Sequence, residues 1–210
     1  MLTRKPCRNL GNSGGFSLIE LLIALLLGAL LLVMVIGLYV TGVSTGATSL
    51  QYSRLRTDLQ SIMAMLETDI RRAGYSGGAE SYLVGANNNK TIDINDNKNC
   101  IVYYYNHNHS ETVESSNKMA FSLNKGVIKF KSGVESVANN VCSQVNGWTD
   151  ISDVSFVTIS DLTFSETVIS SATATVRSVK IKLAGELVSN SHYNHVITTR
   201  VQIRNIEFPY

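Results

Sequence analysis

One stretch constrains this chain more than any other: the 20 residues from Leu21 to Val40 contain no charge and no proline. As an α-helix, at about 1.5 Å of rise per residue, the stretch would be roughly 30 Å long, the thickness of a bilayer's hydrocarbon core. A single carboxylate, Glu20, stands at its start. Burying a charged side chain in lipid costs roughly 3 kcal/mol on insertion scales. The sequence therefore predicts a membrane-spanning helix and a partner for Glu20.

Two simple interpretations leave part of this stretch unexplained. A secretory signal peptide would have a shorter apolar core without a carboxylate, although Gly42-Val43-Ser44 is a tolerable cleavage site. A plain membrane anchor has the right length, but it accounts neither for Glu20 nor for the glycine pair Gly14-Gly15.

The segment Gly14-Gly15-Phe16-Ser17-Leu18-Ile19-Glu20 resembles the prepilin cleavage motif of type IV pilins and of the pseudopilins of type II secretion. The resemblance implies that a prepilin peptidase in the membrane cuts after Gly15 and methylates the new amino terminus of Phe16. It also implies a role in assembly for Glu20, whose carboxylate would meet the Phe16 amine of a neighbouring subunit. The alternative is that Glu20 only snorkels to the lipid headgroups.

The charge distribution fits a leader that is removed. Residues 1–15 hold three of the 18 basic residues and none of the 16 acidic ones, so the mature part carries 15 and 16 and a net charge of −1. The basic surplus of the whole chain lies in the leader, so it gives no reason to expect a nucleic-acid partner. A basic leader on the cytoplasmic side also orients the helix so that the rest of the chain lies outside.

The three cysteines divide in the same way. Cys7 lies in the leader, which leaves Cys100 and Cys142 in the exported part. An oxidising periplasm favours a disulfide between them, and closing a loop of about 43 residues would contribute roughly 4 kcal/mol. A metal site is the weaker alternative, because neither cysteine belongs to a CxxC pair.

Beyond the apolar stretch the helix continues with a different pattern. Apolar residues recur every three or four positions, which indicates an amphipathic helix that ends near Gly74: Tyr52, Leu55, Leu59, Ile62, Leu66, Ile70 and Ala73. We therefore divide the chain into a leader (1–15), a membrane-spanning half-helix (16–43), an amphipathic half-helix (44–74) and a β-rich periplasmic domain (75–210).

Alternating and apolar segments predict strands in that domain: Cys100–Tyr105, Met119–Leu123, Gly126–Lys131, Val154–Phe164, Thr175–Leu183 and His195–Ile206. Asn124-Lys125-Gly126 between two of them predicts a hairpin turn. The expected fold class is α+β and pilin-like, with the long N-terminal helix packed on an antiparallel sheet.

Several segments are similar to PilW-type minor pilins: Asp69–Tyr75 at the end of the helix, the strand Cys100–Tyr105, Gly147–Ile151 and Arg200–Asn205. This resemblance implies a minor pilin that starts or joins a type IV pilus near its tip and supports adhesion, twitching motility or DNA uptake. The alternatives are a J-type pseudopilin of type II secretion and a membrane-tethered periplasmic enzyme or binding protein.

The same resemblance implies the partners and the location. Other minor pilins, the major pilin, the prepilin peptidase and the inner-membrane assembly platform would bind the chain. It would cross the inner membrane once, with its domain in the periplasm, and reach the pilus or cell surface after assembly.

Signals for catalysis or cofactors are weak. Asp93-Ile94-Asn95-Asp96-Asn97 begins like a calcium loop, but Lys98 replaces the turn glycine and Tyr104 stands where the bidentate glutamate belongs. A solvated loop is favoured for residues 87–99, and calcium binding stays the alternative. We expect no catalytic residue, no metal and no cofactor, and a structural role rather than an enzyme.

Overall fold

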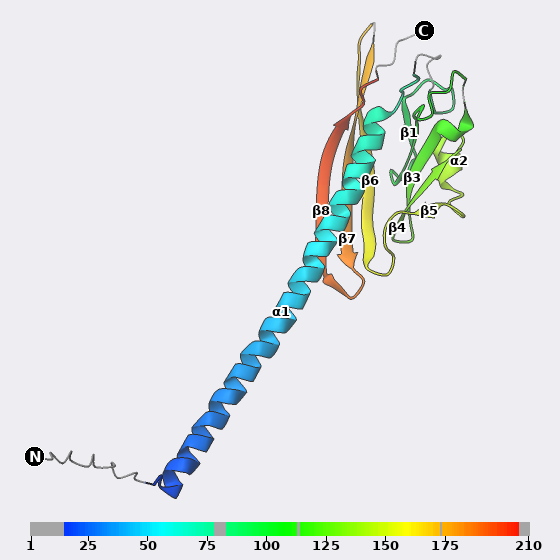
Figure 1. Cartoon of the computed structure of the whole chain (residues 1–210). Helices are drawn as coiled ribbons and strands as arrows, with labels where there is room; N and C mark the ends of the chain where they lie inside the picture. Colours follow the sequence, from blue (N-terminus) through cyan, green and yellow to red (C-terminus); the bar gives the residue numbers. More distant parts are fainter. Residues whose placement is uncertain (1–14, 78–82, 113, 173, 206–210) are drawn as a thin grey trace, which may run out of the picture. The chain divides into compact units, whose positions relative to one another are not determined.

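The computed structural model describes residues 15–77, 83–112, 114–172 and 174–205 (Figure 1). The chain forms two units, Met1–Thr48 and Ser49–Tyr210. One helix, α1 (Leu18–Arg72), contributes its first part to one unit and its second part to the other. The predicted leader lies outside the described residues, apart from Gly15.

The second part of α1 carries the predicted amphipathic stripe. Its buried residues are Leu55, Leu59, Ile62, Met63, Leu66 and Ile70, followed by Ala73. They recur every three or four positions and so lie on one side of the helix, where they enter the core of the domain. The predicted stripe is confirmed.

The C-terminal end of α1 is closed by three contacts. Gly74 adopts φ 79°, the left-handed conformation that ends helices, and its N–H donates to the Tyr104 carbonyl at 2.8 Å. The Asn205 side-chain amide donates to the carbonyls of Arg72 (3.2 Å) and Ala73 (2.8 Å). Because the Asn205 amide satisfies the carbonyls at the end of the helix, the arginines of the final turn need not cap it.

Five short strands form one antiparallel sheet in the order β1-β2-β3-β4-β5: β1 (Ile92–Ile94), β2 (Cys100–Tyr104), β3 (Lys118–Asn124), β4 (Val127–Ser132) and β5 (Thr149–Asp150). A short 3-10 helix, η1 (Ser115–Asn117), precedes β3. The predicted turn joins β3 to β4: Asn124 pairs with Val127, and both Lys125 and Gly126 have positive φ.

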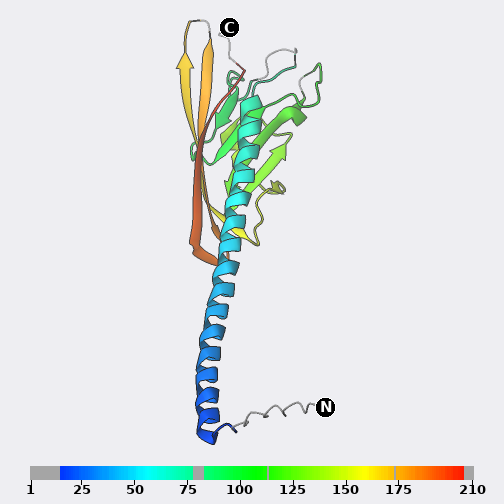
Figure 2. The same cartoon turned by 60° about the vertical axis from the view of Figure 1, so that its left-hand side comes forward.

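Three longer strands form a second antiparallel sheet in the order β6-β7-β8: β6 (Val157–Ser170), β7 (Thr175–Leu187) and β8 (Asn190–Gln202). Backbone hydrogen bonds join β6 to the first sheet, from Ile159 N–H to the Gly126 carbonyl (2.8 Å) and from Phe164 N–H to the Lys98 carbonyl (2.7 Å). The second part of α1 lies beside both sheets (Figures 1 and 2).

The main core lies between α1 and the inner faces of the two sheets. α1 approaches β7 closely at Gly185, where an added Cβ would lie 2.9 Å from Leu59 Cδ2 and 3.2 Å from Val157 Cγ1. A side chain there would separate helix from sheet, so the sequence needs glycine at this crossing.

A second core covers the other face of the five-stranded sheet. Cys100, Val102 and Tyr104 of β2 point into it, whereas Ile101 and Tyr103 point to the main core, which explains why the whole strand is buried. A short helix, α2 (Ala138–Cys142), and Trp148 close this second core.

The predicted α+β class is confirmed, and the strands form two sheets. Each of the six predicted strands overlaps an observed one, but β6 and β7 run further and β8 begins five residues earlier, at Asn190. The residues added at the start of β8 are mostly polar and extend because they pair with a neighbouring strand, as Asn194 does with Glu186. Those added to β6 and β7 mix polar and apolar residues, such as Val168 and Leu187. β1, β5 and α2 were not predicted from the sequence.

Candidate functional site

The N-terminus of α1 is built by the segment that follows Gly15. Ser17 precedes the helix, and its carbonyl accepts the first helical hydrogen bond, from Leu21 N–H at 3.2 Å. Glu20 turns back so that its Oε2 accepts the Ser17 N–H at 3.3 Å. This contact is the glutamate half of a capping box, in which a residue at the third helical position caps the residue before the helix.

The capping contact places the Glu20 carboxylate next to the predicted cleavage site. The partial positive charge of a helix N-terminus stabilises a carboxylate there by about 0.3–1 kcal/mol. Phe16, whose amide would become the mature amino terminus, is adjacent to Ser17 and 87% exposed. The structure therefore brings the predicted residues Phe16 and Glu20 together within one helical turn. The Ser-x-x-Glu spacing is visible in the sequence, but the capping role of Glu20 was not predicted from it.

No described residue of the chain covers the first part of α1. Every residue from Gly15 to Ala47 is exposed, including the large apolar side chains from Leu18 to Val43. The segment is long and apolar enough to cross a membrane. An apolar surface of this size needs an apolar environment supplied from outside the chain, which a bilayer or the core of a helical assembly provides.

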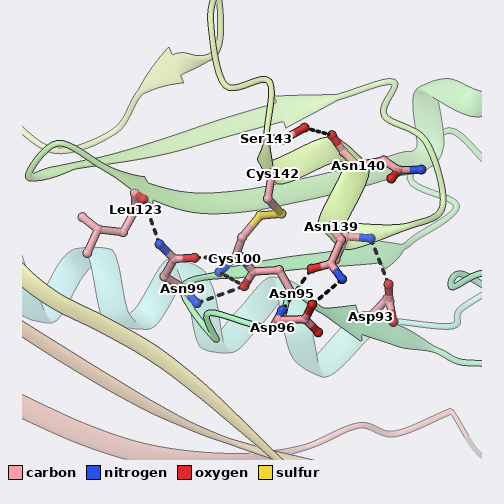
Figure 3. The surroundings of a disulfide bond; sticks show 11 residues. Asp93, Asn95, Asp96, Asn99, Cys100, Leu123, Asn139, Asn140, Cys142 and Ser143 are labelled. Atoms are coloured by element: carbon pink, nitrogen blue, oxygen red, sulfur yellow. Dashed lines mark hydrogen bonds between the residues drawn. A yellow bond between two sulfur atoms is a disulfide. The ribbon is translucent and has the colours of Figure 1, made fainter.

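The predicted pair Cys100–Cys142 forms a disulfide, with Cα atoms 6.1 Å apart (Figure 3). It joins the start of β2 to the end of α2, across 42 positions of the chain. Cys100 is fully buried in the second core, so the bond fastens α2 over that core.

The side chains of the candidate calcium loop hold the loop to α2 instead. Asp93 Oδ2 accepts the Ala138 N–H at 2.8 Å, and Asp96 Oδ2 accepts from the Asn139 side-chain amide at 3.0 Å (Figure 3). Asn95 Oδ1 accepts the N–H of Asn99 and of Cys100. Within the part of the chain that the structure describes, no three His, Cys, Asp or Glu residues are grouped as metal ligands.

A half-buried carboxylate near the end of α1 was also missed in the sequence. The Tyr103 hydroxyl donates to Asp69 Oδ2 at 3.1 Å. Burial raises the pKa of Asp69 above its ordinary value, although the Tyr103 hydrogen bond and the nearby Arg72 act against the shift. Burial also raises the pKa of Tyr103, and the Asp69 carboxylate adds to that shift. Nothing in the sequence pattern pairs residues 34 positions apart.

Two protein families match the chain. The prokaryotic N-terminal methylation motif matches residues 10–36, which include Gly15, Phe16 and Glu20. The family described as prepilin peptidase-dependent protein B, PpdB, matches residues 48–203, most of the chain. The chain belongs to the PpdB family. No curated protein and no solved structure matches it significantly.

The family assignment and the geometry agree. A PpdB protein depends on prepilin peptidase by description, and its methylation motif lies at the start of the exposed apolar helix. The chain is therefore a pilin-like protein, a component of a pilus or pseudopilus, and the first part of α1 fits the membrane anchor of such proteins.

Proposed function

We propose that this chain is a minor pilin of the PilW type, which starts or joins the assembly of a type IV pilus near the filament tip. The observation that carries the proposal is the first part of α1: an apolar helix surface, exposed throughout, behind a methylation motif. Such a helix suits two environments in succession, the inner membrane before assembly and the packed helices of the filament afterwards.

In this proposal the chain performs no catalysis. Its partners are other minor pilins, the major pilin, the prepilin peptidase that cuts between Gly15 and Phe16, and the inner-membrane assembly platform. The domain waits in the periplasm and reaches the cell surface with the filament, where it supports adhesion, twitching motility or DNA uptake.

Glu20 sets the register between subunits. After cleavage, the cationic amine of Phe16 lies within one helical turn of Glu20, and in the filament it meets the Glu20 carboxylate of a neighbour. Any other axial offset would leave a charge buried without a partner, which costs on the order of several kcal/mol.

Two substitutions separate this role from helix capping. Glu20→Ala removes both the charge and the capping acceptor, whereas Glu20→Gln keeps an oxygen that can accept the Ser17 N–H. We expect both variants to be cleaved and inserted but to impair piliation at native expression. Wild-type piliation by both would exclude the pairing role, and rescue by glutamine alone would assign Glu20 to capping.

Mass spectrometry of the purified protein tests whether the chain is cleaved and methylated as a pilin is. A methylated Phe16 as the first residue supports the proposal, whereas an intact Met1 indicates a membrane-tethered domain that does not assemble. Deleting the gene and counting pili then distinguishes a minor pilin from a J-type pseudopilin, whose loss would stop secretion and leave pili unchanged.

A further inference from the structure

The three-stranded sheet has one covered and one open face. Val179, Ile181 and Val201 point from β7 and β8 into the core against α1. The strand register places the alternate residues on the opposite face in three rows across β6, β7 and β8. The rows are Thr163-Lys182-Thr198, Ser165-Lys180-Arg200 and Thr167-Ser178-Gln202. We call these nine residues the polar array.

The polar array carries positive charge without matching negative charge. Its nine side chains are all polar; three are cationic and none is acidic. Lys182 forms an ion pair with Asp161 at 2.9 Å. Lys180 and Arg200 stand directly opposite each other on adjacent strands, and among the described residues neither pairs with a carboxylate. Two like charges directly opposite each other destabilise a sheet. A bound anion between Lys180 and Arg200 would reduce this repulsion.

The positive surface continues beyond the array along a groove. A hollow of ≈ 330 Å³ is lined by Arg200 and Gln202, and it shares Gln202 and Val176 with a second hollow of ≈ 460 Å³. Arg71 and Arg204 line this second hollow. They also line a third hollow of ≈ 460 Å³, together with Arg72. No Asp or Glu is among the described residues that line the three hollows.

Arg71 and Arg204 of the groove are available to a ligand, whereas the Arg72 guanidinium lies over the Tyr105 ring, 5.4 Å from its centroid. The carbonyls at the end of α1 are satisfied by Asn205 and by backbone groups. Arg71 reaches Glu67 only at 3.8 Å, and Arg204 forms no ion pair with any residue that the structure describes. Guanidinium groups that are not engaged elsewhere bind carboxylates through two parallel hydrogen bonds.

From these observations we infer that the polar array and its groove bind an acidic polysaccharide, a chain of uronic-acid sugars. The hydroxyls and the amide of the array can exchange hydrogen bonds with sugar hydroxyls, while the three cations and the groove arginines bind the carboxylates. A protein partner would require an apolar centre. The array has none, and the apolar residues of the groove, Ile169, Val176 and Ile203, lie at the border of the array. A single-stranded nucleic acid would require aromatic rings for stacking along its whole path. Tyr75, Tyr105 and His109 line only the third hollow, which shares no residue with the array, and the array contains no ring.

The binding test uses the full chain in detergent micelles and polygalacturonate as the probe, with fully methyl-esterified polygalacturonate as the uncharged control. We expect the unesterified polymer to bind and the esterified one not to. The double variant Lys180→Gln/Arg200→Gln should weaken binding by up to about 25-fold, since each of two exposed ion pairs contributes up to about 1 kcal/mol, or roughly fivefold. Raising the salt concentration should weaken wild-type binding, because salt screens exposed charges.

A matched variant controls for the loss of two positive charges. Arg56→Gln/Lys131→Gln removes two exposed cations outside the array and groove, and it should bind like the wild type. An unchanged unfolding midpoint shows that the array variant still folds. The inference is overturned if polygalacturonate does not bind, if the esterified polymer binds equally, if both double variants bind alike, or if single-stranded DNA binds more tightly.

Discussion

The two parts of α1 share one backbone conformation but differ in every other respect. From Leu21 to Val40 the side chains are apolar on all sides and exposed, whereas from Ser49 to Arg72 an apolar stripe is buried and polar residues face outward. The difference shows where each part finds its environment. A helix that is apolar all round depends on lipid or on other helices, while a striped helix is completed by the sheets of its own domain.

The largest expected effect comes from shortening a leucine in the buried part. Leu66→Ala removes a fully buried side chain and should lower the free energy of unfolding by about 2–5 kcal/mol. The same change at Leu26, which is 63% exposed, should leave it unchanged. Denaturant unfolding of the full chain in micelles, followed by the fluorescence of the single tryptophan Trp148, measures both. Equal losses would show that the two parts do not differ as described.

The disulfide belongs only to the domain, so removing it should not affect the membrane-directed part. Replacing Cys100 and Cys142 together by alanine should lower the free energy of unfolding by about 2–4 kcal/mol, because the unfolded chain regains the freedom of an open loop. Membrane extraction should find as much of this variant in the membrane fraction as of the wild type. Two free thiols in protein isolated from the periplasm without reductant would contradict the bond itself.

A valine at two glycines tests the packing on each part of the helix. At Gly185 the added atoms would meet Leu59 and Val157, and overpacking of this kind costs about 1–3 kcal/mol. At Gly28 an added Cβ would meet nothing within 4 Å apart from its chain neighbours and the helix's own backbone, so the unfolding of the domain should not change. The same unfolding experiment measures both variants. A Gly185→Val protein as stable as the wild type would mean that helix and sheet are not in close contact there.

Local patterns predicted the two parts of α1 and the longer strands well. The first part of α1 is a continuous apolar run, the second repeats every three or four residues, and the strands alternate. Gly74 at the end of the helix and the turn at Lys125 were also predicted from local chemistry. β1 and β5 were missed because strands of three and two residues show no period, and pairing with β2 and β4 defines them.

The site was predicted in part. Cysteine counting predicted the disulfide that the structure shows, because that signal is compositional. The motif predicted cleavage, methylation and assembly roles for Gly15, Phe16 and Glu20, which stay predictions. The capping contact of Glu20 follows from the Ser-x-x-Glu pattern, but it was not predicted, because the apolar surroundings of Glu20 pointed to a partner outside the helix. The unpaired charges of the polar array depend on the register of three strands, and alternation within one strand does not define that register.

The smallest expected effect compares the carboxylates of the two parts. Glu20 is exposed and caps the helix, whereas Asp69 is half-buried against Tyr103, and burial raises its pKa above the unfolded value. In the pH range just above that unfolded value, about 3.9, the folded state therefore binds more protons than the unfolded state. The contribution of Asp69 to stability is complete below this range and is lost as the pH rises through the folded pKa.

Asp69→Asn removes this dependence while keeping an oxygen that can accept the Tyr103 hydroxyl. Relative to the wild type, the variant should gain stability as the pH rises from about 3.5 to 7, since the unfolded pKa is about 3.9 and the folded one is higher. Denaturant unfolding of both proteins across this range measures the difference, in which the effects of the other titrating groups cancel. Tyr103→Phe should show the opposite trend, because loss of its hydrogen bond raises the pKa of Asp69 further. A difference between Asp69→Asn and the wild type that stays constant, or that grows toward acid, would show that burial does not dominate at Asp69.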